Sequence, residues 1–348
     1  MPENKFDEKV KYIELHPTNN CIFKCPWCTY LQFRERERET LDINIINKVI
    51  DLEPKFLLFC GGGDPSSYST HLNGKRFGLA ELISHIISIL PEVKIQIGTH
   101  AGFPKRDANL LNCLVNADHV GISLDAAYEA SRGPSPGHNN WDTEAFKRTL
   151  QNISQIVVAR TEKKTSTYIC STFTKENWVN LFRIAQALFE KLKSETEDPS
   201  NLKVKFGCTS VADDSRSYDP YYPSRLGDSE KNNWGLLRRL IRNLNLDFSK
   251  FIGKKTNLYK PTKDKTTAYG ITHCGMVENY VLAAADGHYY PCCVMAARRS
   301  CSLGNIADLD PHTLAEKRYQ FYTNGTPPLC ADGCRVRDHT LMGGKAWD

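Results

Sequence analysis

Near its amino end the chain reads Cys21-Ile22-Phe23-Lys24-Cys25-Pro26-Trp27-Cys28, which places three cysteines in the spacing C-x3-C-x2-C. The stretch directly follows Val10–Pro17, a run whose composition predicts a strand. Three thiolates on one short loop can hold three corners of a [4Fe–4S] cluster and leave the fourth iron open, as a reactive metal site requires. A zinc knuckle is the alternative, but it usually has a fourth Cys or His close by, which is absent just downstream.

Short β-rich runs alternate with helical patterns over the first two thirds of the chain. The predicted strands are Val10–Pro17, Phe56–Cys60, Val93–Gly98, His119–Leu124, Thr165–Ser171 and Leu202–Cys208. The predicted helices are Ile43–Leu52, Leu79–Leu90, Asn109–Asn116, Thr143–Val158 and Trp178–Leu192, with Asp42, Asp142 and Asn177 as N-caps. Six β/α repeats predict a parallel sheet with right-handed crossovers, and they are too few for a closed eight-fold barrel. We therefore predict an α/β fold, a partial (β/α)6 TIM-like barrel, with functional loops at the carboxyl ends of its strands.

Three regions are predicted along the chain. Residues 1–212 form the partial barrel, and residues 213–272, rich in charge, Tyr and Pro, form a bridge. Residues 273–348 form a small α+β domain. In this last region Asp286-Gly287 lies between two strand-like runs, Tyr280–Ala285 and His288–Cys292, which predicts a hairpin.

Composition excludes several classes of protein. The net charge of +5 is too small a bias to indicate nucleic-acid or membrane binding. No apolar run reaches the length of a membrane span, and the polar amino end is no signal peptide, so we expect a cytoplasmic protein. Thiols stay reduced there, and the 13 cysteines cluster, with three between residues 21 and 28 and six beyond 273. Such clustering indicates metal ligation rather than disulfides.

The cysteine triplet resembles the signature of the radical S-adenosylmethionine (SAM) superfamily, which has an aromatic residue, here Trp27, before the third cysteine. The resemblance implies that Cys21, Cys25 and Cys28 hold a [4Fe–4S] cluster and that SAM chelates its open iron. Reductive cleavage of SAM would then give a 5′-deoxyadenosyl radical that abstracts a hydrogen atom from an unactivated C–H bond. The cofactor carries this chemistry, and the protein supplies position and access.

Further motifs at predicted strand ends resemble the SAM-binding segments of this superfamily. Gly62, Gly63 and Asp64 resemble its "GGE" motif with Asp in place of Glu, which implies that Asp64 accepts hydrogen bonds from the SAM ammonium. Thr99 stands where relatives carry a Thr-Asn-Gly turn. The remaining matched residues are Ser123 and Asp125 of an "SLD"-like segment, and Arg132, which would meet the SAM carboxylate. Turn capping is the alternative role of Ser123 and Asp125.

The carboxyl-terminal cysteines resemble those of an auxiliary iron–sulfur domain called SPASM, or its shorter form, twitch. Cys274 and Cys292 enclose the pattern C-x12-G-x4-C around Gly287, and Cys330 and Cys334 follow in the spacing C-x3-C. The resemblance implies one auxiliary [4Fe–4S] cluster on these four cysteines. Structural zinc on the same four residues is the alternative, because cysteine spacing alone does not exclude it.

At the position of Cys293, the related sulfatase-maturating enzymes carry an Asp that acts as a base. A thiol is a poor base near neutral pH but a good hydrogen-atom donor to a carbon radical. We therefore predict that Cys293 is a catalytic residue that quenches or steers a substrate radical. The alternative is that Cys293 is a further cluster ligand or a buried structural residue.

The sequence favours a ribosomally made precursor peptide as substrate. The long segment 213–265, with interleaved Tyr and charged residues, is suited to line an open groove, although a solvated connector explains it too. A leader-recognition domain needs about 80 residues, and about ten precede the first strand, so we expect a separate leader-peptide-binding protein, as in tyramine-excising "splicease" enzymes. An electron donor such as flavodoxin or ferredoxin is a further expected partner. The alternative substrate is a small aminosugar or nucleoside, and a non-catalytic iron–sulfur electron carrier fits the cysteines but not the SAM motifs.

Overall fold

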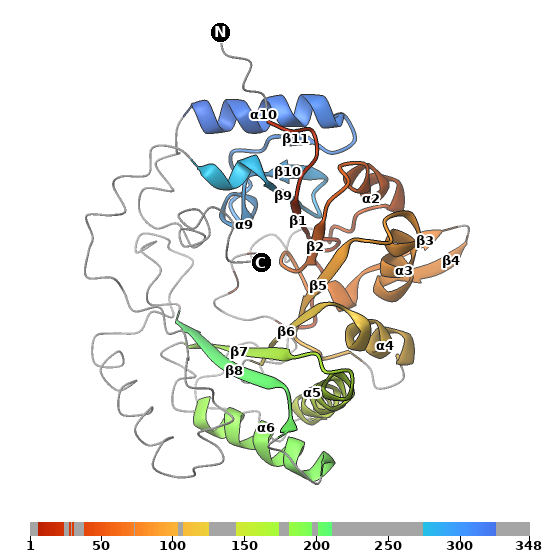
Figure 1. Ribbon diagram of the computed structural model, residues 1–348, viewed down its shortest axis with the longest axis vertical. Helices are drawn as coiled ribbons and strands as arrows, with labels where there is room; N and C mark the ends of the chain where they lie inside the picture. The colour runs from red at the N-terminus through yellow and green to blue at the C-terminus, as the bar shows by residue number, and fades with distance from the viewer. Residues whose placement is uncertain are drawn as a thin grey trace, which may run out of the picture.

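The computed structural model describes residues 6–23, 28, 30, 38–72, 74–103, 107–124, 144–173, 181–196, 201–210 and 274–324. Within them, strands and helices alternate along the chain. Nine of the strands form one bent sheet, and the helices that connect its parallel strands lie along its outer side (Figure 1).

Six strands lie side by side in chain order and run parallel. They are β1 (Tyr12–Leu15), β2 (Phe56–Phe59), β5 (Lys94–Thr99), β6 (His119–Ser123), β7 (Thr167–Phe173) and β8 (Val204–Ser210). All six predicted strands are thus confirmed, as is the parallel α/β arrangement. Short apolar runs between polar loops were sufficient to find them because a strand covered on both faces has little polar surface.

The five predicted helices are confirmed as well. They are α2 (Ile43–Ile50), α3 (Leu79–Ile89), α4 (Ala108–Asn116), α5 (Glu144–Glu162) and α6 (Leu181–Glu195). Their apolar faces pack on alternate residues of the strands, such as Ile13 and Leu15 of β1, in one continuous core. Asp42 caps α2 by accepting the Asn44 amide, as predicted, whereas Asp142 and Asn177 lie outside the described residues.

Carboxyl-terminal strands extend the same sheet on the far side of β1. Strand β9 (Tyr280–Ala283) pairs parallel with β1, β10 (His288–Tyr290) pairs antiparallel with β9, and β11 (Gly304–Asn305) completes the edge. The predicted hairpin is confirmed, and Gly287 turns it with a φ of 81°. Residues from the two ends of the chain therefore meet at the β1–β9 pair, while the boundaries of the bridge, residues 213–272, fall outside the described part.

Several elements were not predicted, and the two largest are a hairpin and a helix near the carboxyl end. The hairpin of β3 (Ser69–Leu72) and β4 (Lys75–Gly78) forms a separate two-stranded sheet, and its polar sequence gives no period-2 signal. Helix α10 (Pro311–Thr323) has the start signal Asp310-Pro311, and the Asp310 carboxylate accepts the Thr313 amide. Few of its residues are buried, so its apolar stripe is weak. None of the helices that the structure describes combines the length and apolar character needed to cross a bilayer.

A buried cation joins α4, α5 and the strands below them. Arg160 of α5 is 0% exposed, and its guanidinium donates to backbone carbonyls of Leu114, Val115, Ala117, Asp118 and Ser166. Several of these carbonyls belong to the carboxyl end of α4, where unpaired acceptors and the helix dipole favour a positive charge. Arg160 therefore gives several buried carbonyl groups a hydrogen-bond donor at once.

We expect Arg160→Met to lower the free energy of unfolding by about 3 kcal/mol, because it keeps the apolar stem but leaves several buried carbonyls unpaired. Equilibrium urea unfolding measures the change. Lys163→Met is the matched control, since Lys163 is an exposed cation one turn further on, and its loss is expected to cost less than about 0.5 kcal/mol. Equal effects of the two substitutions would refute the role given to Arg160.

Candidate functional site

The described part of the cysteine loop lies directly beyond the carboxyl end of β1. Cys21 and Cys28 are half-buried, and the Phe23 amide donates to Cys21 Sγ over 3.4 Å. Backbone N–H groups directed at cysteine sulfur are typical of iron–sulfur sites, where they stabilise the thiolate. The donor set therefore fits an iron–sulfur cluster. Cys25 and Trp27 lie outside the described residues, so their roles stay predictions.

The glycine turn after β2 packs against the segment that leads into the cysteine loop. Gly61 and Gly62 have φ values of 66° and 62°, and a β-carbon on Gly61 would lie 2.1 Å from His16 Nε2. The Gly63 amide donates to Thr18 O (3.0 Å), and a β-carbon on Gly63 would lie 2.1 Å from Asn20 O. Glycine is thus required here by close packing of two loops as well as by backbone conformation.

Asp64 ties this turn to the end of the neighbouring strand β5. Its carboxylate is buried, 4% exposed, and accepts the Ser66 and His100 amides and the Thr99 hydroxyl over 2.7–3.0 Å. The structure therefore brings two predicted SAM-binding residues, Asp64 and Thr99, into direct contact. Their contact with SAM stays a prediction, and the protein donors already engage both oxygens of the Asp64 carboxylate.

Ser123 is the described residue of the predicted "SLD" segment. It ends β6 and is exposed, on the opposite face of the strand from the buried residues Val120 and Ile122. Together with the exposed ring of Tyr168 on β7, it gives the inner face of the sheet an accessible polar and aromatic surface. Asp125 and Arg132 lie outside the described residues.

The carboxyl-terminal cysteines flank the β9–β10 hairpin. Cys274 precedes a short 3-10 helix (Gly275–Glu278) before β9, and Cys292 precedes the short helix α9 (Cys293–Ala296) after β10. Cys330 and Cys334 lie outside the described part, so the four-cysteine ligand set stays a prediction. The Tyr30 hydroxyl donates to the Cys293 carbonyl over 3.0 Å, which places Cys293 beside the amino-terminal cysteine loop.

A buried polar cluster on β1, β2 and β9 was missed in the sequence. The carboxylate of Glu14 accepts hydrogen bonds from His16 Nε2 (2.7 Å), the Cys60 thiol (3.2 Å) and the Tyr280 hydroxyl. Burial alone would raise the pKa of Glu14, but these hydrogen bonds, led by that from His16, hold it below its ordinary value. Glu14 is therefore ionised at neutral pH, at 8% exposure. The available signal was the spacing of Glu14 and His16, two apart on a strand and thus on one face.

A second polar network joins the amino-terminal loop to the region after α9. Arg299 donates to both oxygens of Glu39 over 2.6 Å, and Asn19 exchanges hydrogen bonds with Glu39 through its amide group. Arg299 also lies 3.7 Å from the Asp286 carboxylate at the hairpin turn. These half-buried charges hold the entry to the cysteine loop against the carboxyl-terminal hairpin.

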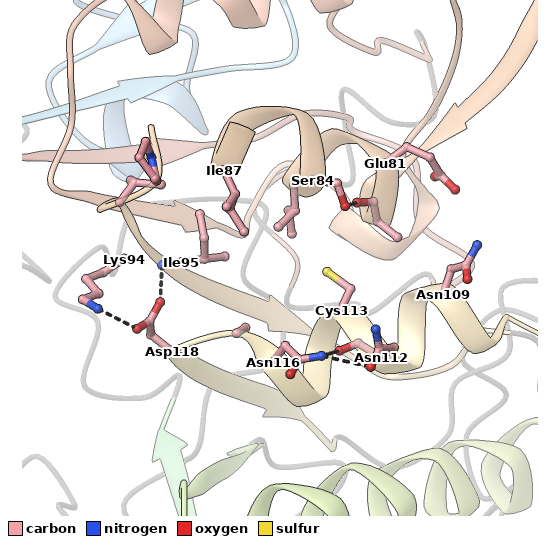
Figure 2. Close-up of a pocket in the computed structure, with 15 residues that line it drawn as sticks. Glu81, Ser84, Ile87, Lys94, Ile95, Asn109, Asn112, Cys113, Asn116 and Asp118 are labelled. Carbon is pink, nitrogen blue, oxygen red and sulfur yellow. Dashed lines mark hydrogen bonds and ion pairs between the residues drawn. The ribbon is translucent and has the colours of Figure 1, made fainter. Parts of the chain in front are cut away.

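The cavity in Figure 2 lies away from these residues. It encloses about 680 Å³ between α3 and α4 on the outer side of the sheet, near Lys94 and Asp118 at the amino ends of β5 and β6. Ligands of parallel α/β sheets bind at the carboxyl ends of the strands, at the opposite edge. We therefore place the candidate site at the carboxyl ends of β1, β2 and β5.

The fold is shared with solved structures of Streptococcus suis SuiB. SuiB bound to its precursor peptide SuiA matches with a TM-score of 0.51 and 15% sequence identity over 93% of this chain and 66% of that one. SuiB bound to S-adenosylmethionine matches with a TM-score of 0.51 and 14% identity. This chain thus spans about two thirds of the length of SuiB. BtrN in complex with AdoMet and 2-DOIA matches with a TM-score of only 0.40 at 12% identity. No family profile and no curated protein sequence matches the chain.

We expect Gly61→Ala to destabilise the protein by about 3 kcal/mol or more, because the new methyl group adds a collision with His16 to the strain of a positive φ. Gly74→Ala is the matched control, since Gly74 has a φ of 76° but nothing within 4 Å of the added carbon, and its cost is expected to be about 1 kcal/mol. Urea unfolding of both variants measures the difference. Similar losses would show that the turn does not pack against His16.

Proposed function

We propose that the chain is a radical SAM enzyme that modifies a ribosomally made peptide. The observation that carries the proposal is the position of Cys21, the first cysteine of the C-x3-C-x2-C motif, which follows β1 on a segment hydrogen-bonded to the glycine turn after β2. The fold shared with SuiB, which has been solved with S-adenosylmethionine bound, supports it.

Cys21, Cys25 and Cys28 would hold the catalytic [4Fe–4S] cluster. The cluster with bound SAM would supply the radical chemistry that removes a hydrogen atom from the substrate. The chain's own residues would then position the cofactor and protect the reacting groups. Asp64 and Thr99 fix the glycine turn to β5, and the Phe23 amide stabilises the Cys21 thiolate.

Cys274, Cys292, Cys330 and Cys334 would hold one auxiliary [4Fe–4S] cluster. The hairpin that Cys274 and Cys292 flank is bonded to β1, the strand that leads into the catalytic loop. An auxiliary cluster there would lie on the same side of the sheet edge as the substrate and could relay an electron. Cys293, beside Tyr30, would then be near enough to the reacting centre to act on a substrate radical.

A peptide is favoured because SuiB, which shares the fold, has been solved with a bound precursor peptide. The inner face of this sheet offers a surface suited to such a substrate, with Ser123 and Tyr168 both exposed. A separate leader-binding protein and an electron donor such as flavodoxin or ferredoxin would complete the system.

We expect the anaerobically reconstituted protein to bind about eight irons per chain and to release 5′-deoxyadenosine from SAM under dithionite. A Cys21→Ala/Cys25→Ala/Cys28→Ala variant is expected to bind about four irons and to release none. Cys113→Ala is the matched control, because Cys113 lies on α4, on the outer side of the sheet, and should leave both measurements unchanged. Absence of SAM cleavage by a protein with intact clusters would overturn the proposal.

The substrate class is tested with the same enzyme. A pool of synthetic peptides should raise the rate of deoxyadenosine release above the rate with SAM alone, whereas a pool of aminosugars and nucleosides should not. The opposite result would identify a small-molecule enzyme with the same radical chemistry.

A further inference from the structure

A second set of metal-ligand types lies below the catalytic loop. Glu14 lies on β1, His16 directly follows that strand, and Cys60 directly follows the neighbouring strand β2. The carboxylate, imidazole and thiol donor atoms of these three residues all lie within 4.8 Å of one another. Glu14 and His16 are 8% and 1% exposed and Cys60 is half-buried, so the set is not a solvated surface cluster. None of the three belongs to the predicted iron–sulfur ligands.

We propose that Glu14, His16 and Cys60 bind a divalent zinc ion. One oxygen, one nitrogen and one sulfur are the donors that Zn²⁺ takes in proteins, and three protein ligands leave a fourth position for water or a substrate atom. This pattern is that of an open, catalytic zinc site rather than a closed structural one.

The distances between the ligand atoms suit an ion that takes the place of the protons in their hydrogen bonds. Glu14 Oε1 lies 2.7 Å from His16 Nε2 and 3.2 Å from Cys60 Sγ. Around a tetrahedral zinc these separations would be about 3.3 Å and about 3.6 Å, as follows from zinc–ligand bonds of about 2.0–2.3 Å. These two separations would therefore widen by only about half an ångström to admit the ion, and all three donor atoms already lie within 4.8 Å of one another.

The protons balance in a simple way. Zinc binding displaces the Cys60 thiol proton to solvent, and the Nε2 proton of His16 transfers to Nδ1 as the imidazole changes tautomer. Within the described part of the chain, His16 Nδ1 is buried and has no hydrogen-bond partner, so it can accept that proton. The ion gains the thiolate and the Glu14 carboxylate, which together neutralise its charge.

The surrounding residues fix the ligands in advance. The His16 ring occupies the space where a side chain on Gly61 would lie, and Gly98 admits Cys60, whose β-carbon would be 3.0 Å from an added one. The Tyr280 hydroxyl holds Glu14 Oε2, which leaves Oε1 directed at the other two ligands. Such outer hydrogen bonds orient metal-binding carboxylates and raise affinity by about 10–100-fold.

The test uses the reconstituted protein with its clusters in place and Zn²⁺ as the probe. Equilibrium dialysis with metal analysis is expected to find one zinc per chain that survives a desalting column. Cys60→Ala and His16→Asn should weaken zinc binding by more than about a hundredfold, and Tyr280→Phe by about tenfold, since it removes only an outer hydrogen bond. Cobalt in place of zinc should give a thiolate-to-metal charge-transfer band that Cys60→Ala lacks.

Cys113→Ala is the matched control. Cys113 is a half-buried thiol whose pKa burial raises to about 12, and it lies between α3 and α4 on the outer side of the sheet (Figure 2). Its removal should change neither zinc stoichiometry nor the cobalt band. Iron and sulfide counts in each variant report whether the clusters and fold are intact, and Cys60→Ala, which deletes one sulfur atom, remains decisive if His16→Asn fails to fold. Undiminished zinc binding in Cys60→Ala, or no zinc bound by protein with full clusters, would overturn the proposal.

Discussion

Two backbone hydrogen bonds hold the functional edge of this protein together. The amides of Gly63 and Asp64 donate to the carbonyls of Thr18 and Asn20 over 3.0 and 2.8 Å, and thereby join the loop after β2 to the loop after β1. Buried backbone groups at the end of a strand need such partners once the sheet ladder stops. The contact is close enough to require glycine at several positions, and it fixes the position of the segment that leads to Cys21.

The constraint spreads from there to the neighbouring strands. Asp64 joins the glycine turn to β5 through its hydrogen bond with Thr99. Arg299 joins the amino-terminal loop to the carboxyl-terminal hairpin through its hydrogen bonds to Glu39. Each of these contacts is buried or half-buried and involves a charged side chain. Its hydrogen bonds are therefore stronger than hydrogen bonds between neutral groups. The loops at this edge are thus held from both sides, as a site that must position a cofactor against a substrate requires.

The sequence was sufficient to predict the six parallel strands, the five helices between them and the carboxyl-terminal hairpin, because each has a local signal: an apolar run, a helical period, or Asp286-Gly287 between strand-like runs. It was not sufficient for contacts that depend on pairing between distant strands. Tyr280 meets Glu14 only because β9 adds to the sheet beside β1, and no local pattern foretells that neighbour. For the same reason the polar face of β1 looked like part of an ordinary strand. Six predicted site residues, Cys25, Trp27, Asp125, Arg132, Cys330 and Cys334, lie outside the described part and stay predictions.

The Glu14 cluster raises a question of free energy that sheet stability alone does not answer. An ionised carboxylate removed from water is costly, and apolar residues of similar size would join β9, β1 and β2 at least as well. Cys60 adds little to the stability of this cluster. Burial and the Glu14 charge raise the pKa of its thiol well above the ordinary value, so the thiol stays protonated and is a weak donor. A divalent cation turns this arrangement into a favourable one, since it gives the carboxylate a counter-charge and makes the thiol a strong ligand. On the zinc proposal, the three side chains are thus placed for what they bind as well as for the strands they hold together.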